Sequence, residues 1–321
     1  MRVERLLDRP IISSDLHPSI GVNIQGPSVI RVPDWIDGRL GNYYLYFADH
    51  KGRYIRLAYA DSLLGPWRIY PPGSLQLKQS CFLTEPPKAT PAHVAQFEAR
   101  LKQNGVAISH DLLLEITTPH IASPDVLSTH GNGGSSCTST GSMPLGRRLP
   151  AWPYRTTAST SAQPEILGRP YMRAFQHDGM TYALTMPGQF SRSKDGMHGF
   201  EPGPVLFNPD MRHSAVMKRD GELWVFWTLV GEAPERILLS RIDLTGDWLN
   251  WKDSPPVEIL RPERSWEGAD APLVPSVRST AYGQVNQLRD PAIFQEDGRI
   301  YLLYAVAGES GIAIAEVLID E

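Results

Sequence analysis

Apolar strands and polar turns alternate along this chain in a pattern that repeats several times. Each copy contains a polar turn, an apolar strand, an Asp-Gly or similar turn, an aromatic-rich strand and a third strand. Clear copies cover residues 289–315, 212–240 and 26–59, a weaker one covers 170–184, and a fifth start lies at 123–127. Asp-Gly between two apolar strands predicts a tight antiparallel hairpin. A repeat of about 40 residues, where no insertion intervenes, is typical of a propeller blade.

The repeat therefore predicts an all-β fold, a single five-bladed β-propeller that spans residues 1–321 as one domain. The blades are expected to begin near residues 26, 123, 170, 213 and 290. Two long insertions, residues 77–119 and 255–288, each precede an innermost strand. Because the strand starts and the loops after the second strands meet at one face, the insertions are expected to decorate that active-site face. Within the first, residues 91–103 have helical spacing and predict a helix, either a lid or a packing element.

Composition narrows the choice of partners. The net charge is −4 and the pI is near 6.2, which gives no basic footprint for nucleic acid. No apolar run has the length of a membrane span and the first residues lack a secretory core, so we expect a cytoplasmic protein without membrane association. The two cysteines form no disulfide framework or zinc motif, and no glycine loop indicates a nucleotide. We therefore expect no cofactor.

Two aspartates, Asp125 and Asp290, open innermost strands beside a proline. Such a pair at a strand start often only caps a turn. Their recurrence at equivalent places in the repeat favours a functional site instead. We therefore predict that the two carboxyls are catalytic, as candidate base and acid.

Further polar residues are expected around these two carboxyls. The predicted ligand-binding residues are His50, Arg173, Arg212, His213, Arg289 and Glu267. The arginines either hold carboxylates in place or bind an anionic group of a ligand. Glu267, on the second insertion, is a further candidate acid, although exposed loop carboxylates are often idle. A single histidine near the axis, His213, is not enough to predict a metal site, and it does not exclude a central ion.

These residues resemble those of the five-bladed propeller glycosidases around glycoside hydrolase family 43. The resemblance rests on residues 26–28, 120–126 and 289–291 and covers nearly the whole chain. It implies a carbohydrate substrate and a central funnel in which carboxylates cleave a glycosidic bond, commonly with inversion. It also implies that Asp125 tunes the acid and orients the substrate. The chain departs from the family at residues 26–28, where an Asp base is usual, and at 171–173, where no Glu acid stands.

Three functions stay open on this basis. The first is a glycoside hydrolase with a relocated pair, Asp125 and Asp290, assisted by His50 or His213. The second is an inverting glycoside phosphorylase, which needs one protein acid and an arginine-rich pocket for phosphate. The third is a non-catalytic carbohydrate-binding or sensor propeller. Added phosphate separates the first two, since only phosphorolysis yields a sugar phosphate, and binding without turnover favours the third.

Residues 128–161 break the repeat and are expected to be aberrant or disordered. The pattern demands a turn and an aromatic strand, but a stretch rich in Ser, Thr and Gly follows, which is typical of a linker. One interpretation is a surface insertion that leaves the second blade without its second strand. The other is a frame-shifted stretch of gene, because suitable codons for residues 137–141 and 156–161 give blade-like sequence in a shifted frame. The coding DNA decides between them.

Overall fold

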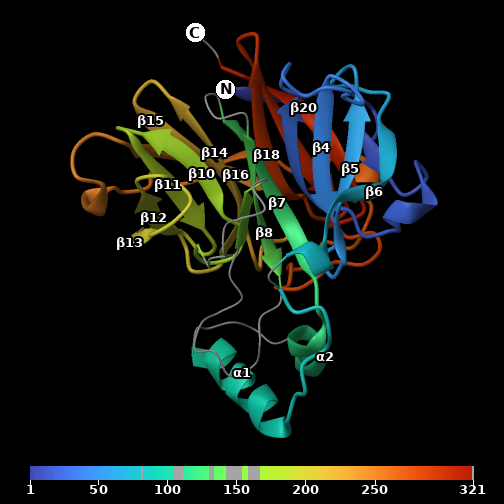
Figure 1. Ribbon diagram of the computed structural model, residues 1–321, viewed down its shortest axis with the longest axis vertical. Coiled ribbons are helices and arrows are strands. Elements are labelled where there is room, and N and C mark those ends of the chain that lie inside the picture. Colours follow the sequence, from blue (N-terminus) through green and yellow to red (C-terminus); the bar gives the residue numbers. More distant parts are fainter. Residues whose placement is uncertain (81, 104–110, 130–133, 142–153, 158–166, 320–321) are drawn as a thin grey trace.

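The computed structural model of the chain describes residues 1–80, 82–103, 111–129, 134–141, 154–157 and 167–319 (Figure 1). Its strands form five separate sheets with antiparallel neighbours: one sheet has five strands, three have four and one has three. The first sheet in the chain comprises β3 (Gln25–Arg31), β4 (Tyr43–Ala48), β5 (Tyr54–Ala60) and β6 (Arg68–Gln76). The second comprises β7 (Ile121–Thr129), β8 (Gly134–Gly141) and β9 (Tyr154–Thr157).

The other three sheets follow in chain order. The third comprises β10 (Arg173–His177), β11 (Met180–Thr185), β12 (Gln189–Ser193) and β13 (Glu201–Val205). The fourth comprises β14 (Met211–Arg219), β15 (Glu222–Leu229), β16 (Ile237–Asp243) and β17 (Val257–Leu260). The last comprises β18 (Arg289–Glu296), β19 (Arg299–Val306), β20 (Gly311–Leu318), β1 (Arg2–Arg5) and β2 (Ile12–Ser13).

The first strand of each sheet lies next to a central axis. Strand β3 contacts both β7 and β18, and β14 contacts both β10 and β18. The circle is completed between β7 and β10, where the guanidinium of Arg173 donates to the carbonyl of Pro124 at 3.1 Å. Sheets arranged around their first strands make an all-β propeller, as the repeat predicted. Four of the sheets have at least four strands, and the second has three.

Three Asp-Gly pairs form the hairpin turns that the sequence predicted. Both residues of the pair have positive φ at Asp178-Gly179, Asp220-Gly221 and Asp297-Gly298. The residues that flank each pair are opposed in the two strands, as His177 is to Met180. Positive φ at both turn residues is the geometry of a type I′ hairpin, which matches the twist of the strands that it joins.

The beginning of the chain completes the last sheet. Strand β1 pairs antiparallel with β20, from Arg2 opposite Leu318 to Arg5 opposite Ala315, and β2 pairs with β20 further along. Figure 1 accordingly shows the two chain ends close to each other at one end of the propeller. Joining both ends of the chain in one sheet closes the circle, and this pairing was not predicted from the repeat.

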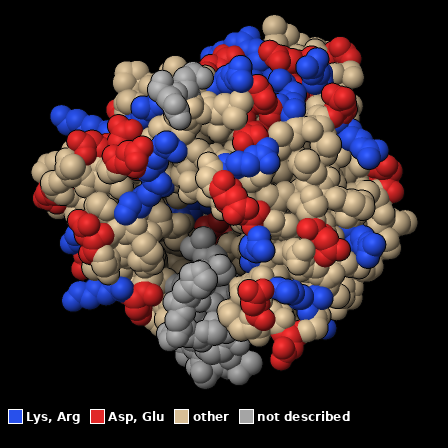
Figure 2. Space-filling model, turned by 90° about the horizontal axis from the view of Figure 1, so that it is seen from above, with Lys and Arg blue, Asp and Glu red and all other residues tan. Residues whose placement is uncertain are grey.

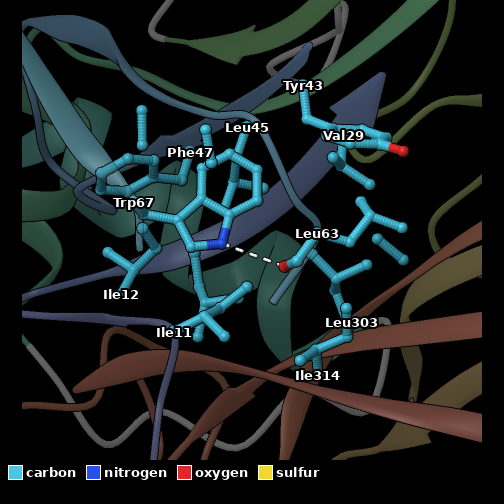
Figure 3. Packing of buried hydrophobic residues seen from close by; sticks show 14 of the residues in the cluster. Ile11, Ile12, Val29, Tyr43, Leu45, Phe47, Leu63, Trp67, Leu303 and Ile314 are labelled. Atoms are coloured by element: carbon cyan, nitrogen blue, oxygen red, sulfur yellow. Dashed lines mark hydrogen bonds between the residues drawn. The ribbon is translucent and has the colours of Figure 1, made fainter. Parts of the chain in front are cut away.

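Apolar side chains fill the wedges between sheets. Figure 3 shows the wedge between the first and last sheets, where Phe47 and Leu303 pack with Trp67. The indole N–H of Trp67 donates to the carbonyl of Leu63 at 3.1 Å, so the buried ring leaves no donor unpaired. Each fully buried side chain of this size contributes about 1.5–3 kcal/mol. Similar clusters lie between the fourth and last sheets and between the third and fourth.

Helices are confined to the connections. The first insertion carries α1 (Pro91–Gln103) and α2 (Leu112–Thr117), and the first of these confirms the helix predicted from spacing. Single 3₁₀ turns lie at η1 (Pro18–Ile20), η2 (Leu77–Gln79), η3 (Trp248–Asn250) and η4 (Ser265–Glu267). Figure 1 places α1 and α2 at the end of the propeller where β7 begins. Among the described helices, none has the length and apolar character needed to cross a membrane.

The second sheet corrects one expectation about residues 128–161. Strand β8 pairs with β7 over its length, with Val126 opposite Cys137, so the second sheet does have a second strand. Strand β9 pairs with β8 in turn. Polar residues form these strands because their neighbours in the sheet satisfy the backbone groups. The remainder of the segment, residues 130–133, 142–153 and 158–161, lies outside the described residues, and the frame-shift hypothesis stays a prediction.

Candidate active site

A ring of residues with left-handed backbone stands where the inner strands begin. One comes from each sheet: φ is 63° at Gly26, 50° at Ser123, 59° at Tyr171, 46° at His213 and 48° at Asp290. In four of these strands the pairing register shifts at the same place, as a β-bulge does. A bulge re-aims side chains, and left-handed residues other than glycine are strained and cluster at functional sites. The five positions therefore mark one special layer of the propeller, which we call the ring.

Neighbours in the ring contact each other around the axis. A Cβ at Gly26 would lie 3.1 Å from the Cα of Ser123, a tight contact that, together with the positive φ, favours glycine there. The rings of Tyr171 and His213 lie 4.8 Å apart between centroids. The Nε2 atom of His213 lies 3.8 Å from Oδ1 of Asp290. These contacts make the ring a compact, buried polar cluster around the axis, which we call the chamber. The end of the propeller where the inner strands start is called the mouth.

Asp290 is the exceptional residue of this chamber. Its side chain is 1% exposed, and neither carboxyl oxygen has a hydrogen-bond partner within the described residues. Burial, reinforced by the nearby negative charge of Glu309, raises the pKa of Asp290 to about 7, although Arg289 and His50 oppose the shift. A buried carboxyl that keeps its proton near neutral pH has the properties of a general acid.

Glu309 provides the contrasting carboxylate. It accepts hydrogen bonds from Nη1 of Arg289 at 2.8 Å, from Nδ2 of Asn23 at 2.7 Å and from Nδ1 of His50 at 3.2 Å. Burial alone would raise the pKa of Glu309, but these three partners outweigh it and lower the pKa to about 2. Two neighbouring carboxyls whose pKa values are driven apart are a recurring arrangement in acid–base active sites.

The arginines of the mouth are engaged in ion pairs. Both Arg212 and Arg289 are buried, and Arg212 forms a two-pronged pair with Glu235. The Nε atom of Arg289 lies 3.5 Å from Glu235, and its Nη1 donates to Glu309. Of the two roles predicted for these arginines, the structure shows the first, that of holding carboxylates in place. Burial opposes ionisation of Glu235, but the two arginines keep its pKa below the ordinary value.

His213 is neutral in this setting. It is buried, its Nδ1 lies 3.4 Å from the hydroxyl of Thr228, and its Nε2 points toward Asp290. Burial, followed by the positive charges of Arg212 and Arg289, lowers the pKa of His213 well below its ordinary range. A neutral imidazole next to Asp290 leaves the carboxyl without a counter-charge from this side and so helps it keep its proton.

The structure places Asp125 and Arg173 away from this chamber. Both line a cavity of about 670 Å³ that is bounded by later parts of the inner strands, such as Val216 and Phe294, and that does not include Asp290. Arg173 donates to the carbonyl of Ser214 at 2.8 Å and lies 3.6 Å from Oδ1 of Asp125. Burial raises the pKa of Asp125, and Arg173 opposes the shift.

This cavity belongs to the opposite end of the channel. Its lining includes Arg31, Glu296 and Asp297, which stand where inner strands end. Figure 2 views the molecule from that end and shows a hollow near the centre that acidic and basic side chains border. We call this the far end. The geometry therefore corrects the predicted pairing of Asp125 with Asp290 and the predicted place of Arg173 in the mouth.

Glu267 is also misplaced by the sequence prediction. Its carboxylate is fully buried and accepts from Nε of Arg5 at 2.8 Å and from the hydroxyl of Tyr304 at 3.0 Å. The backbone N–H of Glu263 donates to the same carboxylate at 2.9 Å. With these partners Glu267 fastens β1 and the second insertion to the last sheet, and its role is structural.

The sequence prediction placed residues 169–173 and 308–309 at the mouth, but it named neither Glu235, Glu309 nor the tyrosine of the ring as a site residue. One feature of the sequence could have identified three of the ring residues: Gly26, Ser123 and Asp290 each directly precede a proline. That alignment makes Ser123, and not Asp125, the counterpart of Asp290. Glu235 and Glu309 lie inside their copies of the repeat, in the loops between the second and third strands, and the repeat pattern does not distinguish them from the neighbouring loop residues. In the part of the chain that the structure describes, no group of three or more His, Cys, Asp or Glu is arranged to hold a metal.

Comparison with known proteins supports the fold and gives one sequence relative. No family model matches the sequence. The uncharacterized protein R118 of Acanthamoeba polyphaga mimivirus is 34% identical over 329 residues, which cover 92% of this chain and 84% of that protein.

Solved structures with a similar fold include several glycosidases. The exo-1,5-α-L-arabinanase from a bovine ruminal metagenomic library is 13% identical with a TM-score of 0.52, covering 93% of this chain and 94% of that one. The α-L-arabinanase of Cellvibrio cellulosa, in complex with arabinohexaose, is 11% identical with a TM-score of 0.51 and 93% coverage of both chains. CoXyl43, a family 43 β-xylosidase/α-arabinofuranosidase from a compost metagenome in complex with xylotriose, is 11% identical with a TM-score of 0.53, covering 99% and 96%. At these identities the likeness establishes the fold, a propeller like that of glycoside hydrolase family 43.

Proposed function

This chain belongs to the same family as the mimivirus protein R118, and from its fold and its site we propose that it cleaves a glycosidic bond at the mouth of the propeller. The observation that carries this proposal is Asp290, a buried carboxyl without a hydrogen-bond partner among the described residues and one of the five residues of the strained ring. A protonated carboxyl in such a place supplies the proton that a leaving sugar oxygen needs.

The surroundings of Asp290 suit this role. Neutral His213 supplies no positive charge that would draw the proton from Asp290. The fixed negative charge of Glu309 disfavours a second carboxylate close by, so the proton stays on Asp290 until it is transferred. Donation to the glycosidic oxygen turns a poor leaving group into an alcohol. General acid catalysis of this kind contributes about 10²–10⁴-fold to the rate.

We also propose that the propeller has five blades, with the three-stranded sheet as the second. Its inner strand β7 contacts β3 and is tied to β10 through Arg173, so it occupies a blade position around the axis. It contributes Ser123 to the ring, as each other sheet contributes one residue. Without this sheet the chamber around Asp290 would be open on one side.

The proposed substrate is a carbohydrate without an essential acidic group. Arabinohexaose and xylotriose are bound by structures that share this fold, which suggests chains of neutral sugars. The charges of Arg212 and Arg289 are already matched by Glu235 and Glu309, so neither is left to hold a sugar carboxylate or phosphate. This favours attack by water over attack by phosphate, and hydrolysis over phosphorolysis.

The test is a turnover screen of the wild type and two variants. Purified protein is incubated with arabino-, xylo- and galacto-oligosaccharides and with the matching aryl glycosides, with and without phosphate. We expect hydrolysis of at least one neutral glycoside, lost by at least about 100-fold in Asp290→Asn. Asp220→Asn is the matched control, because Asp220 also has positive φ but lies in an exposed hairpin turn.

The outcomes separate the three functions. Wild-type rates in Asp290→Asn would contradict the proposal. A sugar phosphate that appears only with phosphate present would show phosphorolysis in place of hydrolysis. Sugar binding by calorimetry without any turnover would favour a carbohydrate-binding propeller.

A further inference from the structure

His50 stands beside the chamber with one ring nitrogen committed. It follows β4, and its backbone N–H donates to Oδ1 of Asn23 at 2.8 Å, which fixes the residue in place. Its Nδ1 lies 3.2 Å from Oε1 of Glu309. The side chain of His50 is 19% exposed, whereas that of Glu309 is 1% exposed. The pair therefore extends from the buried ion network to the solvent side of the mouth.

The partner of Nδ1 determines where the ring proton lies. Glu309 is ionised and only accepts hydrogen bonds, so Nδ1 of His50 carries the hydrogen. The neutral ring then has its lone pair on Nε2, which makes no hydrogen bond within the described residues. An imidazole oriented by a buried carboxylate, with the other nitrogen available, is the arrangement of a general base.

Other groups near the mouth are less suited to accept a proton from water. The oxygens of Glu309 are occupied by Arg289, Asn23 and His50 itself. His213 is fully buried next to two arginines, which oppose its protonation. Asp125 lines the separate cavity that opens at the far end. His50 is connected to the residues around Asp290 through Glu309, because Glu309 also accepts from Arg289, the residue that directly precedes Asp290 in the chain.

We propose that His50 is the general base of this active site and that Glu309 positions it, an inference that rests on the glycosidic cleavage proposed above. Water attacks the anomeric carbon, and its proton passes to Nε2 of His50. The bond from that carbon to the leaving oxygen breaks, and this oxygen takes the proton of Asp290. The products are a sugar of inverted configuration and an alcohol, with His50 as imidazolium and Asp290 as carboxylate. Exchange with solvent returns each proton.

The first experiment separates the base from the acid by means of the leaving group. A dinitrophenyl glycoside leaves without a proton, so Asp290→Asn should regain activity to within about tenfold of the wild type on it. His50→Gln should stay about 100-fold or more below the wild type in kcat on both this and an unactivated substrate, with KM changed less than threefold. His198→Gln is the matched control, because that histidine is half-exposed and pairs with Asp195 on another loop.

Azide gives a second readout for the same role. Azide needs no base, so it should restore turnover of His50→Ala and yield a glycosyl azide of inverted configuration. His50→Gln with wild-type kcat, while Asp290→Asn is inactive on the unactivated substrate, would overturn this inference and leave the proposed function intact. If Asp290→Asn instead has wild-type kcat on the unactivated substrate, the proposed function is contradicted.

The tautomer of His50 tests the pair without any substrate. In ¹⁵N-labelled wild-type protein, with signals assigned by comparison with His50→Gln, Nδ1 should be protonated and Nε2 should not. Glu309→Gln should disturb this tautomer and lower kcat about tenfold or more, which an effect on folding alone would not do. If Nε2 of His50 is protonated and Nδ1 is not in the wild-type protein, the inference is overturned.

Discussion

The two ends of the central channel place similar residues in different environments. At the mouth, Asp290 has left-handed backbone, no hydrogen-bond partner among the described residues and a neutral histidine beside it. In the cavity that opens at the far end, Asp125 has an arginine 3.6 Å away and accepts a long hydrogen bond from Ala174. Asp290 directly precedes a proline, whereas Asp125 directly follows one. A shift of two residues along a bulged strand thus decides which carboxyl joins the ring.

The comparison also shows how one site contains both a charged and an uncharged carboxyl. Glu309 and Glu235 have arginine partners and stay ionised, while Asp290 shares the chamber without one. Buried charges need such partners, since an isolated one is strongly disfavoured. The arginines of the mouth therefore form ion pairs with carboxylates of the protein itself.

The largest difference in catalytic activity is expected between variants of the two aspartates. Asp290→Asn should lower kcat/KM on an unactivated glycoside by about 10³-fold, because the proton donor is lost. Asp125→Asn should lower it by less than about tenfold, because that side chain only braces Arg173. Steady-state kinetics of both variants on one substrate checks this. Equal losses in the two variants would erase the distinction between the two ends.

Replacement of Glu235, the carboxylate that Arg212 and Arg289 share, should have the largest effect on stability. Glu235→Leu leaves Arg212 and Arg289 buried with one partner fewer, so the free energy of unfolding should fall by about 3–5 kcal/mol. Urea unfolding followed by tryptophan fluorescence measures it. Glu201→Leu, which breaks the more exposed pair with Arg192, should change it by no more than about 1 kcal/mol. A loss as small as that of the control would mean that the ion network does not hold the mouth together.

Asp290 should also make the fold less stable as pH rises. Its folded pKa of about 7 exceeds the ordinary 3.8, so between these values the unfolded chain has lost a proton that the folded protein still holds. Stability is therefore lost as pH rises through this window. Asp290→Asn lacks this loss and should unfold with about 2–4 kcal/mol more free energy than the wild type at pH 8, and with little difference at pH 4.

The same stability experiment controls for misfolding. If Asp290→Asn is inactive yet more stable than the wild type at pH 8, its inactivity comes from the chemistry of the missing acid. A variant less stable than the wild type at pH 8 would show that the carboxyl supports the fold at that pH.

The smallest effect concerns the pH dependence of turnover. Because Asp290 must be protonated to act, kcat/KM should decline as pH rises through about 7. Each pH unit above that midpoint should cost about tenfold in rate. A profile that stays level to pH 9 on an unactivated substrate would mean that a different group donates the proton.

The repeat in the sequence carried most of the fold and part of the site. Asp-Gly turns and aromatic strands predict hairpins because their preferences are local, and those at Asp220 and Asp297 are present. Closure through β1 was missed because that strand pairs with β20, more than 300 residues away in the chain. The partners of Arg212 and Arg289 were missed for a different reason. Glu235 and Glu309 lie only 23 and 20 residues further along the chain, but no motif marks the loops that carry them. Asp290 was named as a candidate because it lies inside the repeat, and Asp125 was paired with it because the sequence does not show the bulge that shifts the register.

Titration of the Asp290 carboxyl tests the account most directly. The ¹³C shift of the side-chain carboxyl in labelled wild-type protein is followed from pH 3 to pH 9 and assigned by its absence in Asp290→Asn. A midpoint near pH 7 is the result that the burial of Asp290 beside Glu309 predicts. A midpoint near the ordinary value of about 4 would mean that Asp290 is ionised at neutral pH and does not serve as the acid.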